Sequence, residues 1–460
     1  MGQGLTWAER LTLWAYGLVM RALQPLLRRK LRRRGQQEPG YLDHMPQRFG
    51  FYEGIAPEPG RIWVHAVSLG ETRAAAILIE ALRLVRPGMR LLLTHSTATG
   101  WAQGQALLRP CDAQAWLPWD TPEATRRFLQ HHRPQLGILM ETEVWPSLVQ
   151  SCVQAQVPLA LANARLNDKS LRSALRWSWL SRPAYRRLTA VLAQSPDDGA
   201  RLAQLGATVQ AVLGNLKFDV PAQPEAKALA QVWRQRWQHH GTPRPVVMLA
   251  SSREGEEALW LQALMANTDR LTALKAAGVV WLLVPRHPQR FDEIHAWLTA
   301  QGLAVVRRSS WDVGPPLQVP SDQLTVCLGD SLGEMPVYFQ SADMALLGGS
   351  FMSLGGQNLI EAAAFGCPVI MGPHTFNFAE AAQNAQQVGA AMRVSDMDSA
   401  LDQVCAWLRQ PAELASARQK GLDLVAQSRG AAQHYAQALA SLVKTSSATL
   451  QPMRGPRPER

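Results

Sequence analysis

Two successive series of short apolar runs, separated by segments of helical length, constrain this 460-residue chain more than any other feature. Continuous runs of Val, Ile and Leu are typical of parallel strands that are covered by helices on both faces. The first series contains RIWVHAV, RLLLTH, LGILM, PLALAN, AVLAQ and VQAVLG, and the second contains PVVMLAS, GVVWLLV, LAVVR, LTVCLG, ADMALLG, CPVIMG and AAMRV. Two series in tandem predict an α/β chain of two doubly wound, Rossmann-like domains, which also suits its length.

The domain boundaries follow from changes in composition. The string FDVPAQPEAK interrupts the alternation with two prolines and reads as a linker, and an Ala-, Leu- and Gln-rich helical region closes the second series. The predicted segments are an amphipathic, basic segment at 1–36, a first domain at 37–218, a linker at 219–228, a second domain with terminal helices at 229–443, and a disordered basic tail at 444–460.

Positive charge is concentrated at the start of the chain. The net charge is +11, and the first 34 residues hold eight basic residues against one acid, Glu9. The ten uncharged residues LTLWAYGLVM are too few for a bilayer span, which needs about 20. Apolar residues recur at helical spacing, namely Trp7, Leu11, Trp14, Leu18 and Ala22. The string RRKLRRR follows, so we expect a helix on the surface of an anionic membrane. The alternative is a helix packed on the protein's own core with a solvated basic end. The remaining chain is nearly balanced in charge, which argues against a nucleic-acid partner.

The five cysteines lie far apart, with no CxxC pair and no nearby histidine pattern. This spacing indicates reduced thiols in a cytosolic compartment and predicts no metal site.

Polar residues follow several of the first-domain strands, at the edge where open parallel sheets bind ligands. Glu71 falls in the first turn of the helix after RIWVHAV, where it either favours the helix dipole or serves as a general base. The loop HSTATG supplies hydroxyl groups that either cap a helix or contact a ligand. Glu141 and Glu143 come directly after LGILM, and Lys217 follows the last strand of the series. Lys217 either pairs with one of these carboxylates or stabilises phosphate charge.

The second domain carries features typical of a nucleotide site. Arg286 ends a strand in the string PRHP, where it either clamps an anion or pairs with an acid. Two glycine pairs, 348–349 and 355–356, precede a helix that begins near Asn358 and contains Glu361. Glycines at a helix start let phosphate approach backbone N–H groups, and an acid one turn later can bind ribose hydroxyls. The absence of GxxxxGK[ST], GxGxxG and GxSxG disfavours P-loop NTPases, dehydrogenases and serine hydrolases.

Taken together and in order, nine strings resemble those of the 3-deoxy-D-manno-octulosonic acid (Kdo) transferases over roughly residues 40–425. They are VHAVSLGETRAA, ETEVWPSL, NARL, GNLKFD, ASSREGEE, LLVPRHPQRF, GDSLGEMP, GGSFMSLGGQNLIEAAAFGCPV and GPHTFNF. The resemblance implies a GT-B glycosyltransferase, with two Rossmann-like domains facing an interdomain cleft and a membrane-surface helix at the N-terminus. It implies an inverting, metal-independent enzyme without a cofactor, which moves Kdo from CMP-Kdo to a hydroxyl of the lipid A precursor in lipopolysaccharide biosynthesis. Its place would be the cytoplasmic face of the inner membrane of a Gram-negative bacterium.

The resemblance also implies roles for individual residues. Glu71 would be the general base, and Glu141 with Lys217 would support the transition state; Glu141 is preferred over Glu143 for this role. The CMP site would comprise Pro285, Arg286, Leu332, Gly333, Glu334, Asn358, Leu359, Ile360 and Glu361.

Two other functions stay open at this stage. One is a GT-B transferase or sugar-nucleotide epimerase that uses a UDP donor, since such enzymes share the glycine turns. The other is a catalytically silent, membrane-recruited binding protein, against which the presence of Glu71, Glu141 and Lys217 argues.

Overall fold

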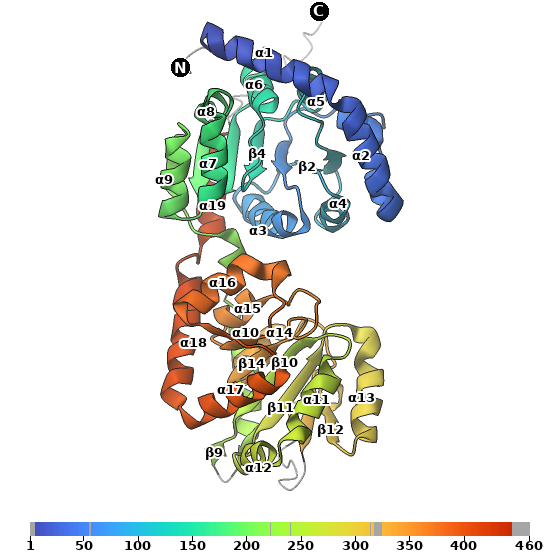
Figure 1. Cartoon of the computed structure of the whole chain (residues 1–460), viewed down its shortest axis with the longest axis vertical. Helices are drawn as coiled ribbons and strands as arrows, with labels where there is room; N and C mark the ends of the chain where they lie inside the picture. Colours follow the sequence, from blue (N-terminus) through green and yellow to red (C-terminus); the bar gives the residue numbers. More distant parts are fainter. Residues whose placement is uncertain are drawn as a thin grey trace, which may run out of the picture. The chain divides into compact units, whose positions relative to one another are not determined.

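The chain forms two compact units in this computed structural model, which describes residues 5–54, 57–220, 222–239, 241–312, 314–316 and 324–443 (Figure 1). The first unit contains the chain up to Lys217 together with the segment from Gly430 onward, and the second contains Phe218–Arg429. The predicted tail, 444–460, lies outside the described residues, as does position 221 of the predicted linker.

The first unit is built on a seven-stranded sheet with the order β3-β2-β1-β4-β5-β6-β7, and all its pairings are parallel. Its strands are β1 (Ile62–His65), β2 (Leu91–His95), β3 (Ala113–Trp116), β4 (Leu136–Met140), β5 (Leu159–Ala164), β6 (Ala190–Ala193) and β7 (Val209–Val212). Its helices are α1 (Trp7–Ala22), α2 (Gln24–Gln37), η1 (Pro39–Tyr41), η2 (Met45–Phe49), α3 (Leu69–Val85), α4 (Ala98–Gln105), α5 (Pro122–His132), α6 (Pro146–Gln154), α7 (Asp168–Arg176), α8 (Ser178–Arg186), α9 (Pro196–Gln204) and α19 (Ala431–Ser441).

The second unit repeats this architecture with the parallel order β12-β13-β11-β10-β14-β15-β16. Its strands are β10 (Val246–Ser252), β11 (Val280–Pro285), β12 (Ala304–Arg307), β13 (Thr325–Leu328), β14 (Met344–Leu347), β15 (Val369–Met371) and β16 (Ala391–Arg393), with a small hairpin of β8 (Gln238–His239) and β9 (Thr242–Pro243). Its helices are η3 (Leu216–Phe218, which spans the boundary), α10 (Pro224–Arg236), α11 (Glu256–Ala266), α12 (Thr268–Ala276), η4 (Pro288–Arg290), α13 (Phe291–Ala300), η5 (Arg308–Ser310), α14 (Met335–Ser341), α15 (Leu359–Ala364), η6 (Phe376–Phe378), α16 (Ala379–Val388), α17 (Met397–Arg409) and α18 (Pro411–Ala426). The prediction of two doubly wound domains, the architecture of the GT-B class, is confirmed.

Strand register in the first unit brings the carboxyl ends of β1, β2 and β4 to one edge. His65, the last residue of β1, lies beside Thr94 of β2 and Leu139 of β4. The residues that follow these strands therefore share this edge, as doubly wound sheets require.

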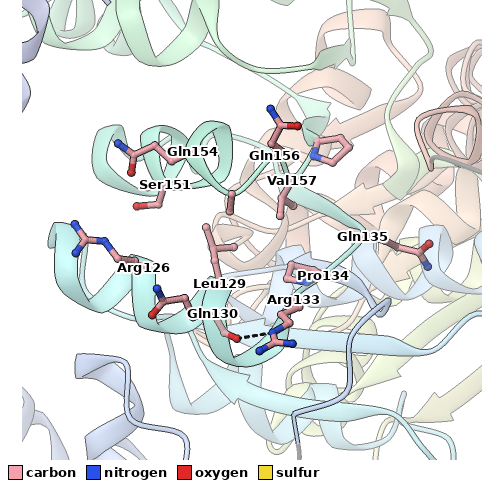
Figure 2. Close-up of a pocket in the computed structure, with 12 residues that line it drawn as sticks. Arg126, Leu129, Gln130, Arg133, Pro134, Gln135, Ser151, Gln154, Gln156 and Val157 are labelled. Atoms are coloured by element: carbon pink, nitrogen blue, oxygen red, sulfur yellow. Dashed lines mark hydrogen bonds between the residues drawn. The ribbon is translucent and has the colours of Figure 1, made fainter. Parts of the chain in front are cut away.

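The opposite edge of the same sheet has a cavity of its own, of about 630 Å³. It lies between α5 and α6, where Pro134 and Gln135 precede β4 and Pro158 precedes β5 (Figure 2). Since it lies at the amino ends of the strands, this cavity does not belong to the edge that carries the predicted catalytic residues.

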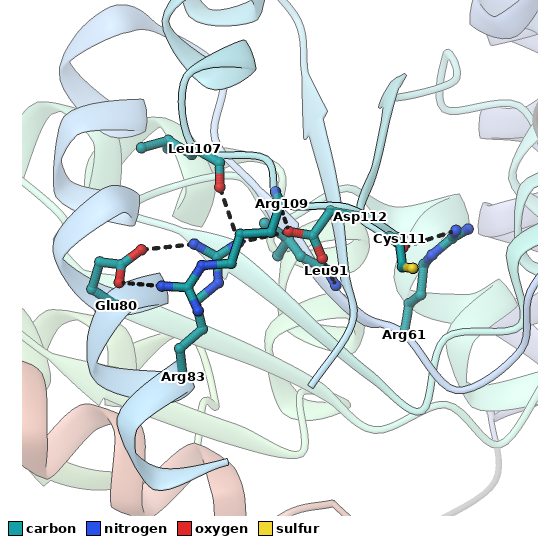
Figure 3. Close-up of polar contacts among 8 residues, drawn as sticks. All are labelled: Arg61, Glu80, Arg83, Leu91, Leu107, Arg109, Cys111 and Asp112. Atoms are coloured by element: carbon teal, nitrogen blue, oxygen red, sulfur yellow. Dashed lines mark hydrogen bonds and ion pairs between the residues drawn. The ribbon is translucent and has the colours of Figure 1, made fainter. Parts of the chain in front are cut away.

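A polar network anchors the C-terminal half of α3 to the start of β2 and to the segment before β3 (Figure 3). The buried guanidinium of Arg83 pairs with Asp112 at 2.6 Å and with Glu80 at 2.7 Å. The carboxylate of Asp112 also accepts the backbone N–H groups of Leu91 at 2.8 Å and Arg109 at 2.9 Å. Because buried ionic groups are stable only when fully partnered, this network fixes the axis of α3, whose other end carries Glu71.

At the N-terminus, α1 lies across the helices that flank the sheet of the first unit (Figure 1). It packs where Gly17 is buried against Pro122, the first residue of α5; a Cβ at Gly17 would stand 2.9 Å from the proline ring. The predicted apolar residues Trp7, Leu11 and Trp14 are 79%, 49% and 60% exposed, so they do not form part of the protein's own core. In the described part of the chain, no helix combines the length and apolar character needed to cross a membrane.

The structure corrects three details of the predicted organisation. First, α19 packs on the first unit and not on the second, because Tyr435 and Leu439 are fully buried in the core that includes α3 and the sheet of that unit. Second, the predicted linker is largely structured, since α10 begins at Pro224 and Phe218 is buried in the core of the second unit. Third, β3 is an edge strand that the apolar pattern misses, because half of its four residues are only partly buried and one is Gln114.

The packing of α19 predicts where a mutation in it will act. Leu439→Ala removes a fully buried side chain from the core of the first unit, so the free energy of unfolding of this unit should fall by about 2–5 kcal/mol. Gln437→Ala, at an exposed position of the same helix, should change it by less than about 0.5 kcal/mol. Hydrogen exchange resolved by peptide measures each unit separately, and faster exchange in the second unit alone would contradict this assignment of α19.

Candidate active site

The carboxylate of Glu71 is held by the loop between β1 and α3. Its Oε2 accepts the backbone N–H of Val67 at 2.8 Å, and its Oε1 accepts the hydroxyl of Ser68 at 3.2 Å. Ser68 is the N-cap of α3 and in turn accepts the backbone N–H of Glu71 at 3.4 Å. These reciprocal bonds complete the start of the helix and also fix the position of the carboxylate.

The environment of Glu71 makes it a better base than an ordinary glutamate. Burial, together with the negative charges of Glu141 and Glu143, raises the pKa of Glu71 to about 7, and the bonds from Val67 and Ser68 only partly oppose this shift. A carboxyl whose pKa lies near the working pH is both available as a carboxylate and able to retain a proton. A carboxylate that only capped the helix would need neither this burial nor a raised pKa.

Glu141 lies directly after β4 as a buried carboxylate with two cationic partners. Its Oε1 lies 2.7 Å from the Nζ of Lys217, and its Oε2 lies 2.7 Å from the Nε of Arg165. Its backbone has φ of +57°, which is rare for a residue other than glycine. Strained backbone of this kind clusters at functional sites because the surrounding structure must enforce it.

The structure distinguishes Glu141 from Glu143. Glu143 accepts a bond from the indole N–H of Trp145 at 2.9 Å, and burial raises its pKa. Of the two carboxylates, Lys217 pairs with Glu141. The preference for Glu141 in supporting the transition state stays a prediction.

The loop HSTATG supports the segment that holds Glu71. The hydroxyl of Thr97 caps α4 by accepting the N–H of Gly100 at 3.2 Å, and it donates to the carbonyl of Val67 at 2.7 Å. The Nδ1 of the buried His95 lies 2.9 Å from the carbonyl oxygen of Ala66, and burial lowers the pKa of His95 to about 4. Capping and loop support therefore account for these two residues.

In the second unit, the end of β10 packs so closely against the first glycine pair that Gly348 has no space for a side chain. A Cβ at Gly348 would lie 2.2 Å from the carbonyl oxygen of Ser251, which itself has φ of +55°. The buried carboxylate of Glu256 accepts the N–H of Gly349 at 2.6 Å and that of Phe351 at 3.1 Å. The glycine turn is thus fixed by an acid from α11, which the sequence analysis did not single out.

Arg286 and Glu361 lie near one another in the second unit. Pro285 ends β11 and is buried, whereas Arg286 is exposed directly after it. Burial raises the pKa of Glu361, and the positive charge of Arg286 partly opposes this rise. Within the described ranges, the Arg286 guanidinium has no ion pair, so it is available for an anion.

The remaining predicted nucleotide residues differ in what their side chains can contact. Glu334 pairs with Arg308 at 2.7 Å, Leu332 is 75% exposed, and Gly333 has φ of +80°. Asn358 is exposed and caps α15 by accepting the N–H of Ile360 at 3.1 Å.

Leu359 and Ile360 are buried in the core of the second unit. The expectation that they contribute to a nucleotide site is therefore limited to their backbone groups, because their side chains face packed neighbours.

Comparison with known proteins identifies the family. The chain is 48% identical over 409 residues to the 3-deoxy-D-manno-octulosonic acid transferase of Bordetella pertussis, an alignment that covers 86% of this chain and 91% of that protein. The chain belongs to the Kdo transferase family. It is also 31% identical over 425 residues to the transferase of Haemophilus influenzae, covering 91% of this chain and 96% of that one. The family model for 3-deoxy-D-manno-octulosonic-acid transferase matches residues 43–220.

Among solved structures, the C-terminal CMP-Kdo binding domain of WaaA from Acinetobacter baumannii is 27% identical, with a TM-score of 0.38, and covers 44% of this chain and 98% of that domain. The predicted family and the predicted glycosyltransferase class are confirmed by the curated relatives.

Sequence reasoning missed several polar residues of this Kdo transferase. Arg165, in the string NARL that follows the apolar run PLALA, was given no role, yet it is the second cation on Glu141. Glu256, in the string ASSREGEE, was given no role, yet it is fully buried and binds the glycine turn. Arg48 was not considered at all. An ion pair between segments distant in the sequence leaves no periodic signature, so only its position after a strand could have indicated the role of Arg165.

The shifted pKa of Glu71 predicts a measurable titration. In carboxyl-selective NMR, Glu71 should titrate with a midpoint near pH 7, and Glu143→Gln should lower this midpoint by removing a neighbouring negative charge. Because the folded-state pKa exceeds the unfolded value, ionising Glu71 destabilises the fold as pH rises from about 4.5 to about 7. Glu71→Gln should remove this part of the pH dependence of unfolding. A midpoint near 4.5 would contradict the assigned environment.

Proposed function

We propose that this protein is an inverting glycosyltransferase that moves Kdo from CMP-Kdo to a hydroxyl of the lipid A precursor in lipopolysaccharide biosynthesis. The chain aligns with most of the length of two curated relatives, and both are named 3-deoxy-D-manno-octulosonic acid transferases. The observation that carries the proposal is the carboxylate of Glu71, which is fixed by two hydrogen bonds and has a pKa raised to about 7.

The first unit would activate the acceptor. Glu71 takes the proton of the acceptor hydroxyl while that oxygen attacks the anomeric carbon of Kdo, and the bond from this carbon to the phosphate oxygen of CMP breaks. A positioned base typically contributes about 10²–10⁴-fold to the rate. Glu141 and Lys217 form the ion pair beside it, and the free donor positions of the ammonium group would stabilise charge that develops on the leaving phosphate.

The second unit would bind the donor. Arg286 would pair with the phosphate of CMP, and the backbone around Pro285, Leu332, Gly333 and Glu334 would contact the nucleotide. Asn358, the backbone of Leu359 and Ile360, and the carboxylate of Glu361 would complete this site. Because the positive charge comes from Arg286 and Lys217, we expect neither a metal ion nor another cofactor to take part.

Transfer itself provides the test. Incubation with CMP-Kdo and a tetra-acylated lipid A precursor should yield a product heavier by one Kdo unit or more, measured by mass spectrometry. Glu71→Gln should lower the rate by at least about 100-fold, while CMP should still raise the thermal midpoint of the variant as it does that of the wild type. Unchanged turnover in Glu71→Gln would remove this residue from the mechanism. Stabilisation by UDP in place of CMP would point to a different donor.

The N-terminal helix would hold the enzyme at the cytoplasmic face of the inner membrane. Trp7, Leu11, Trp14 and Leu18 recur on one side of α1 and all four are exposed. Basic residues of α2 follow at once, and each basic residue near anionic lipid contributes about 1 kcal/mol to attraction.

Vesicle binding tests this anchoring. Replacing both Trp7 and Trp14 by Ser should weaken binding to vesicles that contain phosphatidylglycerol by at least about tenfold, because two exposed indoles no longer enter the interface. Leu84→Ser, which alters an 82% exposed leucine on α3, serves as the matched control and should bind as the wild type does. Equal binding of all three proteins in a flotation assay would argue for a helix that serves only the protein's own fold.

A further inference from the structure

A second cavity of the first unit, of about 470 Å³, lies at the edge that carries Glu71. One wall consists of apolar residues from the end of α1 and from α2, including Leu23, Leu27 and Leu31. The opposite wall includes Leu117, after β3, and Leu148, on α6. The cavity is thus bounded on one side by the predicted membrane-surface segment and on the other by the sheet.

The same cavity is lined by a buried arginine without an acidic partner. Arg48 is only 3% exposed, and its guanidinium lies over the ring of Trp116, 3.9 Å from the centroid. One Nη donates to the carbonyl of Ser96 at 3.2 Å, while Nε has no partner. None of the ion pairs between described residues includes Arg48. Burial lowers the pKa of Arg48 to about 10, which still leaves it charged at neutral pH.

The two carboxylates that line this cavity are engaged elsewhere. Asp120 accepts the N–H groups of Ser147 at 3.0 Å and Leu148 at 2.8 Å. Glu143 accepts the indole N–H of Trp145. A buried charge normally has a counter-ion, because its desolvation is costly. Arg48 therefore has no counter-ion among the carboxylates that line the cavity, and a bound anion would supply one.

The cavity also reaches the loop that positions Glu71. Val67, whose N–H binds the Glu71 carboxylate, lines the cavity, and so do Ser96 and Thr97. An anion held by Arg48 beside Ser96 would place the rest of its molecule next to the proposed base. Two further cations, Lys30 and Arg34, line the cavity from α2.

We propose that this cavity is the acceptor subsite, in which Arg48 pairs with an anionic group of a phosphorylated, acylated glycolipid and Leu23, Leu27 and Leu31 contact one of its acyl chains. Charge complementarity selects an anion, and the apolar wall selects an acylated ligand over a free phosphate. This inference rests on the proposed function, since it assigns the acceptor of that reaction to a defined set of side chains.

Kinetics of an Arg48 variant test the anionic contact. Arg48→Met keeps the length and apolar body of the side chain but removes its charge. It should raise the KM for the bisphosphorylated, tetra-acylated acceptor by at least about tenfold, because a charged hydrogen bond is lost. The rise in thermal midpoint on adding CMP should not change. With a dephosphorylated acceptor, wild type and variant should have similar KM values; a tenfold difference there, or an unchanged KM with the phosphorylated acceptor, would overturn the role of Arg48.

A pair of leucine variants tests the apolar wall without altering Arg48. Leu27→Trp fills part of the cavity, whereas Leu26→Trp places the same side chain at a neighbouring position that is 61% exposed. Leu27→Trp should raise the acceptor KM at least about fivefold and Leu26→Trp should leave it unchanged, while both keep the CMP-induced shift. Equal effects of the two substitutions would overturn the assignment of the acyl chain.

Two controls distinguish the acceptor subsite from a failure of the proposed function and from binding of bulk anionic lipid. If the wild type transfers no Kdo, the proposed function fails; if it transfers Kdo and the variants do so with unchanged KM values, only the acceptor subsite fails. Vesicles of phosphatidylglycerol, added as a competitor, should inhibit wild type and Arg48→Met equally. Inhibition that depends on Arg48 would show that the cavity binds bulk anionic lipid and would overturn the assignment to the acceptor.

Discussion

The pairing of one buried carboxylate with two cations holds together the edge of the first unit that carries Glu71. Glu141 comes from β4, Arg165 follows β5, and Lys217 lies where the chain leaves the unit, so three separate segments meet at a single carboxylate. Removing either cation would leave a buried negative charge undercompensated, which is why such pairs are costly to break even when they add little net stability. The left-handed backbone at Glu141 is tolerated because these contacts hold it in place. Burial raises the pKa of the neighbouring Glu71, and the carboxylates of Glu141 and Glu143 add to this rise.

In the second unit, a buried acid binds backbone N–H groups and holds a turn in place. Glu256 is fully buried, and its partners are the backbone N–H groups of Gly349 and Phe351 in the glycine turn and of Arg253, and not cations. Hydrogen bonds from N–H groups compensate a carboxylate without neutralising it, so the turn is fixed while its outer surface stays free for a ligand. The two units thus share one architecture, and each has a buried acid near the carboxyl ends of its strands, held by cations at Glu141 and by backbone N–H groups at Glu256.

Features that depend on residues close together in the sequence could be predicted, whereas features that depend on contacts between distant segments could not. Strands buried on both faces could be predicted because each has its own apolar run, and the polar residues after them were found because topology places them at one edge. The edge strand β3 was missed because Gln114 and its neighbours carry no such run. The site of α19 was assigned wrongly because an apolar helix face does not say which core it covers. Arg48 was missed because its environment is assembled from η2, β3 and the loop after β2, which are distant in sequence.

The return of the chain to the first unit at α19 has a consequence for biosynthesis. The second unit is one uninterrupted stretch, Phe218–Arg429, and is therefore complete as soon as that stretch has left the ribosome. The first unit still lacks the helix that covers α3, so its core closes last although most of it is synthesised first. Domains usually fold in the order in which they are made. Here the nascent chain must carry an open apolar surface until translation of α19 is finished.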